Sequence, residues 1–307
     1  MRICVMGAGA VGSYYGAKLQ KAGNEVFYIC RGEQLKALKK NGLYIKSPDG
    51  DLKLKVSAGK DPGEFAPYDL VLFTVKSRDT IEASSGLIRH AGKKTIILSL
   101  QNGLTPALML RKFFSSRVMG GVAFIANRTE KPGVIRHYGA GSLSISELEN
   151  RHTERLDAVK TLFKEAGIPC SVQEDFNVPL WKKLMWNTCF NPLSVIFEQT
   201  LGPLVTNRFA VKTGIELMNE TWAVADALGI KLDREAVIKA SFDLDPALHE
   251  FETSMLQDFR KGKPMETDEI LGAVLKKADA LKLQAPRLSC VYDILKAKEM
   301  MNTEDGK

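Results

Sequence analysis

A glycine-rich turn near the N-terminus is the first group of residues that could do chemistry. Gly7-Ala8-Gly9-Ala10-Val11-Gly12 follows the strand-like run Arg2–Met6 and leads into a helical pattern. In such a turn the first glycine permits the tight bend, the second lets the backbone approach a pyrophosphate, and the third allows close packing of helix on strand. The positive end of the helix faces the anion. The spacing therefore predicts a dinucleotide site, and the alternative is a glycine-rich turn without a ligand.

The residue after the second predicted strand indicates which dinucleotide is bound. NAD-binding domains place an acidic residue there, near the ribose 2′-hydroxyl. This chain has Arg31 instead, and the nearest acid, Glu33, already belongs to the next helix. A guanidinium can hold a 2′-phosphate through two hydrogen bonds. NADPH is therefore the predicted cofactor, and the alternative is a solvated arginine at a strand end.

Two more polar residues follow predicted strands at the edge where open α/β sheets bind ligands. Lys76 follows the run 69–75, and Asn102 follows the run 95–100. A lysine there can reach a phosphate or a ribose, and an Asn-Gly turn can present amide groups to a nicotinamide or a substrate. A plain turn is the alternative for Asn102.

A second group of polar residues lies in the segment 181–192. Lys183, Asn187 and Asn191 recur every four residues, which places them on one face of a helix. A polar stripe on a mostly apolar helix is costly unless it lines a wet cleft or meets partners. Because a proline disfavours helical geometry in the residue before it, Pro192 predicts a bend at Asn191. The alternative is a solvated face with tryptophan packing.

Three further polar residues lie near the C-terminal end. Ser254 and Asp258 form a pair at helical spacing. Glu266 follows a break at Gly262 and Pro264 and lies near the first turn of the next helix, where the helix dipole favours an ionised carboxylate. A glutamate on the surface at a helix start is the simpler interpretation of Glu266 alone.

The elements that must position these residues change in character along the chain. In the first half, β-branched runs alternate with helical patterns, which predicts an α/β fold with a Rossmann-type, doubly wound, mostly parallel sheet. Besides the runs already named, the expected strands are 25–30, 117–125, 134–138, 142–146 and 169–172, with a hairpin around Ser47-Pro48-Asp49-Gly50. The expected helices are 11–22, 32–40, 78–90 and 153–166.

After residue 175 the apolar periods become helical. The best stretches are 179–188, 207–228, 247–261 and 267–281, which predict an all-α second half. We therefore expect an NADP-binding domain over residues 1–173 and a helical substrate and catalytic domain over residues 174–307.

Composition excludes several classes of protein. The 307 residues, 45% apolar and 26% charged, suit two globular domains. The charge of +7 comes from dispersed residues, which favours a small anionic ligand over nucleic acid. Five cysteines without C-x-x-C spacing indicate neither a disulfide framework nor a metal site and predict a cytoplasmic location. No segment predicts a membrane span.

With these residues assembled, the chain resembles the 2-dehydropantoate 2-reductases, also called ketopantoate reductases, over essentially its whole length. The motifs that carry the resemblance are the glycine turn, Arg31-Gly32, Thr74-Val75-Lys76, Gln101-Asn102-Gly103, the stripe with Pro192-Leu193, Ser254-Met255-x-x-Asp258 and Glu266. The resemblance implies a Rossmann domain, a helical domain, an active site in the cleft between them, and hydride transfer from NADPH to the C2 carbonyl of ketopantoate.

The same resemblance implies a role for each candidate residue. Lys183 would be the general acid, and Glu266 would support catalysis. The residues that would hold the 2-keto acid are Asn102, Lys183, Asn187, Asn191 and Ser254. The residues that would contact NADPH are Gly7, Ala8, Gly9, Ala10, Val11, Gly12, Arg31, Lys76 and Asn102. No metal is needed for this chemistry.

Two departures from the family pattern and two other functions remain open. Ser146-Glu147 stands where the family commonly has Gly-Glu, which questions the local backbone geometry, and Ala285-Pro286 replaces Thr-Pro.

A reductase of another branched 2-keto acid would share every motif, whereas a non-catalytic NADPH-sensing regulator would not need Lys183 and Glu266. The expected partner is a small-molecule 2-keto acid, without nucleic acid or membrane, and a homodimer is left open.

Overall fold

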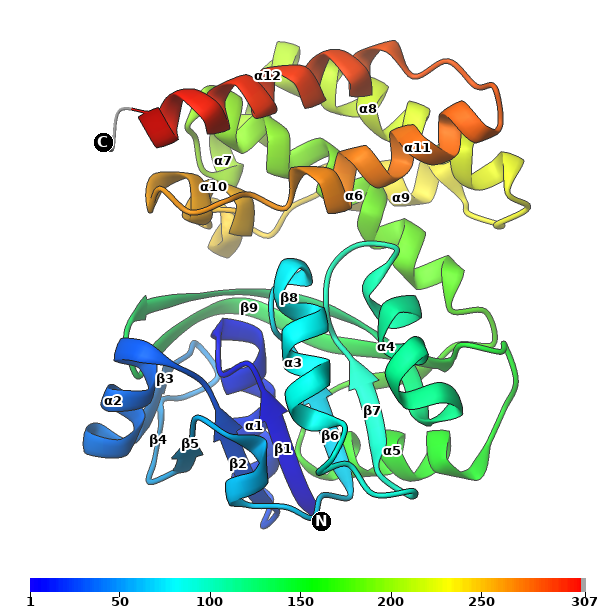
Figure 1. The fold of residues 1–307 in the computed structure, drawn as a ribbon. Helices are drawn as coiled ribbons and strands as arrows, with labels where there is room; N and C mark the ends of the chain where they lie inside the picture. The colour runs from blue at the N-terminus through cyan, green and yellow to red at the C-terminus, as the bar shows by residue number, and fades with distance from the viewer. Residues whose placement is uncertain (305–307) are drawn as a thin grey trace. The chain divides into compact units, whose positions relative to one another are not determined.

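The computed structural model describes residues 1–304, and the chain divides into two compact units, Met1–Phe176 and Asn177–Lys307. The first unit is built on a curled sheet and the second on helices (Figure 1). The α/β fold with an all-α second half is therefore confirmed.

The first unit contains one sheet with the order β4-β3-β9-β8-β7-β6-β1-β2-β5, and β10 pairs with β9. The strands are β1 (Arg2–Met6), β2 (Glu25–Ile29), β3 (Leu43–Lys46), β4 (Leu52–Leu54), β5 (Ser57–Gly59), β6 (Leu70–Phe73), β7 (Ile96–Ser99), β8 (Val118–Lys131), β9 (Val134–Glu147) and β10 (Cys170–Val172). Only the β3–β4 and β8–β9 pairings among the described strands are antiparallel, which confirms a mostly parallel sheet.

Helices cover both faces of this sheet because its central strands are apolar on both sides. Side chains of β1 alternate between two cores: Ile3 and Val5 join one, and Cys4 and Met6 join the other. The helices of this unit are α1 (Ala10–Lys21), α2 (Gly32–Asn41), α3 (Thr80–Leu87), α4 (Pro106–Phe114) and α5 (Glu154–Glu165). α1 and α5 pack into the first core, and α3 and α4 pack into the second.

The prediction of two separate strands at 134–138 and 142–146 is wrong, because β9 is continuous. Its pairing with β8 shifts register near Ala140, which has φ +58°, and Gly141, which has φ +125°. A bulge of this kind bends a strand without ending it. The sequence prediction also missed β5 and α4, which are short.

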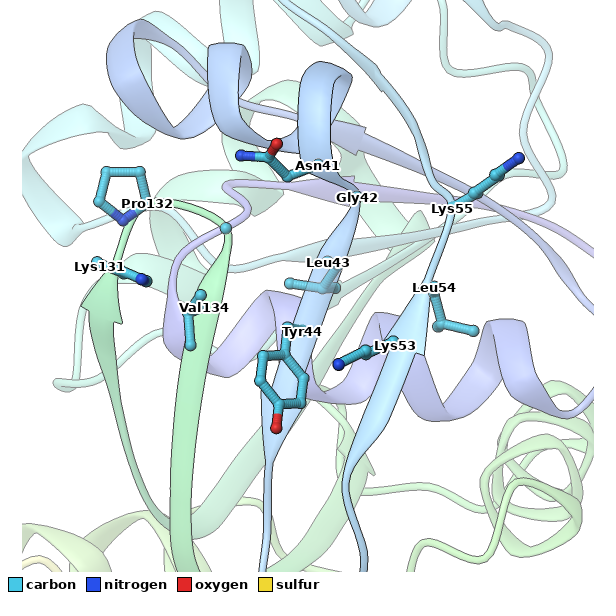
Figure 2. A pocket seen from close by; sticks show the side chains of 11 residues that line it. Asn41, Gly42, Leu43, Tyr44, Lys53, Leu54, Lys55, Lys131, Pro132 and Val134 are labelled. Carbon is cyan, nitrogen blue, oxygen red and sulfur yellow. The ribbon is translucent and has the colours of Figure 1, made fainter.

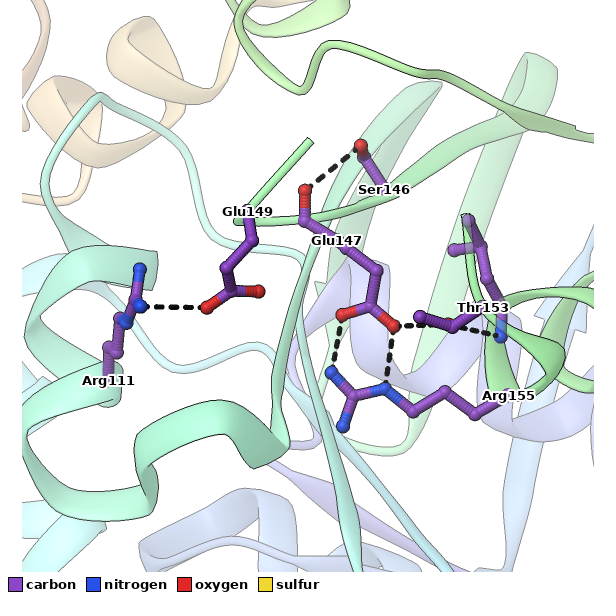
Figure 3. Close-up of polar contacts among 7 residues, drawn as sticks. Arg111, Ser146, Glu147, Glu149, Thr153 and Arg155 are labelled. Atoms are coloured by element: carbon purple, nitrogen blue, oxygen red, sulfur yellow. Dashed lines mark hydrogen bonds and ion pairs between the residues drawn. The ribbon is translucent and has the colours of Figure 1, made fainter. Parts of the chain in front are cut away.

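The end of β9 carries the Ser146-Glu147 departure. Ser146 is paired with Gly120 in the ladder, and its hydroxyl donates to the Gln173 carbonyl at 2.7 Å, so the strand stays extended without a glycine. Figure 3 shows the Glu147 carboxylate held by Arg155 and Thr153. The Glu147 side chain has 0% exposure.

All regular secondary structure in the described residues of the second unit is helical. Its helices are α6 (Asn177–Phe197), α7 (Leu201–Thr206), α8 (Arg208–Ala227), α9 (Arg234–Phe242), α10 (Ser254–Arg260), a π-helical turn (Asp268–Gly272), α11 (Ala273–Ala280) and α12 (Pro286–Glu304). α6 packs against α8, α10 and α12 and forms the centre of the unit. No helix in residues 1–304 is long and apolar enough to cross a membrane.

Two predictions for this unit are wrong. α6 does not end near Thr188 or leave helical geometry at Asn191; it continues through Pro192 to Phe197. Asn191, Pro192 and Leu193 are all buried, and the packing of α6 outweighs the local cost of an interior proline. The stretch 247–261 is not one helix, because the Thr253 hydroxyl caps Leu256 and starts a new helix at Ser254.

Candidate functional site

The glycine turn lies between β1 and α1, and its glycines have different reasons to lack a side chain. Gly7 has φ +104°, and a Cβ there would come within 2.7 Å of the Val75 nitrogen. A Cβ on Gly12 would lie 2.6 Å from the Gly7 carbonyl oxygen. A Cβ on Gly9, in contrast, would meet no atom within 4 Å. Gly7 and Gly12 are thus required by packing, and Gly9 faces open space that a pyrophosphate could fill.

Neighbouring segments hold the carbonyl groups of this turn. The Thr74 hydroxyl donates to the Gly7 carbonyl at 2.7 Å, the Gln34 amide to the Ala8 carbonyl at 2.9 Å, and the Asn127 amide to the Ala10 carbonyl at 3.0 Å. The first N–H groups of α1 have no partners within the helix and lie at its positive end. This arrangement suits a bound anion and fits the phosphates of a dinucleotide.

Arg31 caps the start of α2, directly after β2. Its side chain is 58% exposed, and its Nη1 atom forms an ion pair with Oε1 of Glu82 at 2.7 Å. Glu33, the nearest acid in sequence, pairs with Lys36 instead. The acid that pairs with Arg31 is therefore Glu82 of α3, and the sequence spacing does not predict this contact.

Lys76 and Asn102 follow β6 and β7, which are neighbours in the sheet. The Ser77 hydroxyl donates to the Asn102 carbonyl at 3.3 Å. The Gln101 amide donates to the Val75 carbonyl at 3.0 Å and thereby joins the two loops. The motif Gln101-Asn102-Gly103 predicts Asn102 but not Gln101 as a site residue. The position of Gln101 just after β7 is the signal that could have identified it as a positioning residue.

The polar stripe of the second unit lies on α6, as the spacing predicts. Lys183 is half-buried, Asn187 is 5% exposed and Asn191 is 1% exposed. The interpretation of the stripe as a solvated face is therefore wrong. The Asn191 side-chain nitrogen is buried without a hydrogen-bond partner among the described residues. An unpaired buried amide costs about 1–3 kcal/mol, so this group is poised for an acceptor from a ligand.

Burial and a nearby carboxylate both act on the Lys183 ammonium. Desolvation lowers the pKa of its ammonium to about 8, although the nearby Glu266 carboxylate acts to raise it. Glu266 is only 6% exposed, so the interpretation as a surface glutamate at a helix start is also wrong. Glu266 precedes the π-helical turn, which packs on α6. Turns of this kind are frequent at functional sites.

Ser254 is the first residue of α10, and α10 packs on α6. The preceding residue, Thr253, anchors this contact, since its hydroxyl lies 2.6 Å from that of Ser194. Ser194 in turn donates to the Asn191 carbonyl at 2.8 Å. The sequence prediction missed Thr253 and Ser194, whose hydrogen bonds connect Asn191 to the residue that precedes Ser254.

A separate pocket in the first unit contains none of the candidate residues (Figure 2). It has a volume of about 500 Å³ and lies beside β3, β4 and the β8–β9 turn. Lys53 lines it from β4, which is an edge strand, and Lys55 lines it from the residue after that strand. Charged residues on an edge strand commonly prevent pairing with other chains, and this accounts for both lysines. Within residues 1–304, no cluster of three or more His, Cys, Asp or Glu side chains could hold a metal ion.

Two family models match nearly the whole chain. Residues 3–150 match the model described as "Ketopantoate reductase PanE/ApbA", and residues 175–299 match its C-terminal counterpart. The chain is 32% identical to the 2-dehydropantoate 2-reductase of Pyrococcus abyssi, over 98% of this chain and 99% of that protein.

Two kinds of solved structure share the fold. A PanE/ApbA family ketopantoate reductase from Ralstonia eutropha JMP134 superposes with a TM-score of 0.89 at 33% identity, covering 98% of this chain and 99% of that one. A D-mandelate dehydrogenase bound to NADH and anilino(oxo)acetate superposes with a TM-score of 0.90 at 25% identity, with the same coverage.

Proposed function

The chain belongs to the ketopantoate reductase family, and we propose that it reduces 2-dehydropantoate to pantoate, a step in pantothenate and coenzyme A biosynthesis. The observation that carries this proposal is the placement of Lys183 on α6, where its ammonium is desolvated and interacts with the buried Glu266 carboxylate. Lys183 shares its helix with two buried amides, Asn187 and Asn191.

The proposed reaction needs a hydride, a proton and a fixed orientation of the keto acid. A bound nicotinamide cofactor supplies the hydride to the C2 carbonyl carbon. Lys183 polarises the carbonyl oxygen and protonates the alkoxide as it develops. Positioned acids of this kind contribute about 10² to 10⁴ in rate, most effectively when their pKa lies near the working pH. Glu266 keeps the ammonium charged in a desolvated setting.

The substrate-binding groups in this proposal are amides and a hydroxyl. The unpaired Asn191 nitrogen donates to an oxygen of the keto acid, and Asn187 and Ser254 orient the remaining polar groups. Asn102, which follows β7 in the first unit, would offer its amide to the nicotinamide or to the substrate. Amide and hydroxyl groups of this kind can donate hydrogen bonds to the oxygens of a keto acid, which supports these roles.

NADPH is the proposed cofactor because of Arg31 and Lys76. The exposed Arg31 guanidinium can take a 2′-phosphate, and Lys76 can reach a phosphate or ribose from the end of β6. The glycine turn, with its open position at Gly9, holds the pyrophosphate.

A second candidate is the reduction of a different 2-keto acid. It is favoured by the likeness to a D-mandelate dehydrogenase bound to anilino(oxo)acetate, which has the same fold and a comparable TM-score. The stripe on α6 would serve either substrate, since its groups recognise the 2-keto acid unit and not the side chain.

Steady-state rates over a panel of 2-keto acids, each with NADPH and with NADH, test the proposal. The panel holds ketopantoate, 2-ketoisovalerate and benzoylformate. The proposal predicts the highest kcat/KM for ketopantoate with NADPH. A higher kcat/KM for benzoylformate would favour the second candidate, and no turnover of any member would contradict both.

A further inference from the structure

Glu82 forms an ion pair with Arg31, and the two residues belong to segments that follow the strands on either side of β1. Arg31 follows β2, and Glu82 lies in the first turn of α3, which follows β6. In the sheet, β2 and β6 are the two neighbours of β1, whose end carries Gly7. The 2.7 Å contact therefore connects segments on either side of the proposed pyrophosphate site.

We propose that Glu82 is a cofactor-selectivity residue that competes with the 2′-phosphate of NADPH for the Arg31 guanidinium. This inference rests on the proposed function, in which Arg31 receives that phosphate. Through this competition, Glu82 reduces the preference of the protein for NADPH over NADH.

The competition follows from the chemistry of the two acceptors. A guanidinium binds either a carboxylate or a phosphate through the same N–H groups, and Glu82 already occupies Nη1. NADPH must displace this carboxylate from the guanidinium or share the guanidinium with it. Sharing places the negative 2′-phosphate close to the negative carboxylate. NADH carries a neutral hydroxyl at that position and meets no such competition.

The ion pair is weak enough to be displaced. Its side chains are 58% and 69% exposed, and exposed pairs of this kind contribute little to stability. Glu82 therefore modulates the affinity for NADPH and does not abolish it.

The experiment measures the dissociation constants of NADPH and NADH by calorimetry for the full chain and its variants. Glu82→Gln keeps the size of the side chain and removes its charge. We expect it to lower the Kd for NADPH by about 3- to 5-fold at low salt, and less at high salt, because screening weakens exposed pairs. The Kd for NADH should stay within about twofold.

Glu33→Gln is the matched control, because Glu33 is an acid of similar exposure two residues from Arg31 but pairs with Lys36 at 2.8 Å. It should change neither Kd by more than about twofold. An equal gain in NADPH affinity from Glu33→Gln would show a general charge effect and overturn the proposal.

Arg31→Ala separates the two claims. If it weakens NADPH binding while Glu82→Gln leaves the Kd for NADPH unchanged, the cofactor assignment holds and the role of Glu82 is overturned. If Arg31→Ala leaves NADPH binding intact, both the NADPH assignment and the competition fail. In the Arg31→Ala background, competition predicts that the gain from Glu82→Gln disappears, and a full gain there would contradict it.

Discussion

The Glu266 carboxylate raises the pKa of the Lys183 ammonium while burial lowers it, and burial has the larger effect. The resulting pKa of about 8 is lower than that of an ordinary lysine. Lys183 is therefore still charged at neutral pH, yet it can release its proton during turnover.

The pH dependence of catalysis should report this balance. Only charged Lys183 can donate a proton, so we expect kcat/KM for ketopantoate to fall as the pH rises through about 8. Glu266→Gln removes the charge that raises this pKa and should move the decline to lower pH. Asp268→Asn, a control on the adjacent turn whose partners are Tyr292 and Lys296, should not move it. A decline unmoved in Glu266→Gln would contradict the coupling.

The glycine turn offers a comparison between binding and packing. A Cβ on Gly9 meets no protein atom, so Gly9→Ala should keep its thermal stability but obstruct the pyrophosphate, raising the Kd for NADPH by about tenfold or more. A Cβ on Gly12 would lie 2.8 Å from the Val5 side chain, so Gly12→Ala should lose about 1–3 kcal/mol of unfolding free energy. Calorimetric titration and urea unfolding measure the two effects; unchanged NADPH affinity in Gly9→Ala would remove this turn from the site.

Asn187 and Thr188 are adjacent on α6 but have different expected roles. Asn187→Ala should raise KM for ketopantoate with little change for NADPH, because an amide that orients the substrate is lost. Thr188 is fully buried and its hydroxyl lies 2.8 Å from that of Thr221, so Thr188→Val should lower the melting temperature and leave KM unchanged. The same KM in both variants would exclude Asn187 from the substrate site.

The buried Glu147 carboxylate should matter for stability. Burial raises its pKa, but hydrogen bonds from Arg155 and Thr153 outweigh this effect and hold the pKa below its usual value. Glu147→Ala leaves Arg155 unpaired and should cost about 2–4 kcal/mol of unfolding free energy, somewhat less than for a fully buried pair because Arg155 is 28% exposed.

Glu149→Gln is the control for this loss. Glu149 pairs with Arg111, which is 45% exposed, so its loss should cost less than about 1 kcal/mol (Figure 3). Urea unfolding of both variants measures the difference. Equal losses of unfolding free energy in the two variants would show that the buried Glu147–Arg155 pair stabilises the fold no more than the exposed Glu149–Arg111 pair does. Since the pKa of Glu147 is lowered, its contribution is present at neutral pH and should be lost as the pH falls through that pKa.

Local sequence patterns predicted the parts of the fold that depend on local chemistry. The run Arg2–Met6 is apolar on both faces and forms β1 with the predicted bounds, and the turn after it needs glycine at Gly7 and Gly12. The four-residue spacing of Lys183, Asn187 and Asn191 places them on one helix whatever the rest of the chain does.

Features that depend on tertiary contacts could not be predicted in this way. Pro192 favours a break, but α6 continues through it while packing on α8 and α10. Glu266 alone is typical of a surface helix start, and only the fold buries it near Lys183. Glu82 is far from Arg31 in sequence, and no spacing rule connects them.

The most direct test of the account is the turnover of ketopantoate by Lys183→Ala with saturating NADPH. The matched control is Lys182→Ala, which removes an exposed ammonium from the adjacent position on the same helix. Circular dichroism and NADPH titration establish that each variant is folded and binds cofactor. If Lys183 is the proton donor, its loss should lower kcat and kcat/KM together by about 10² or more, while Lys182→Ala stays near the parent rate. A folded, NADPH-binding Lys183→Ala variant with the turnover of the Lys182→Ala control would contradict the assignment.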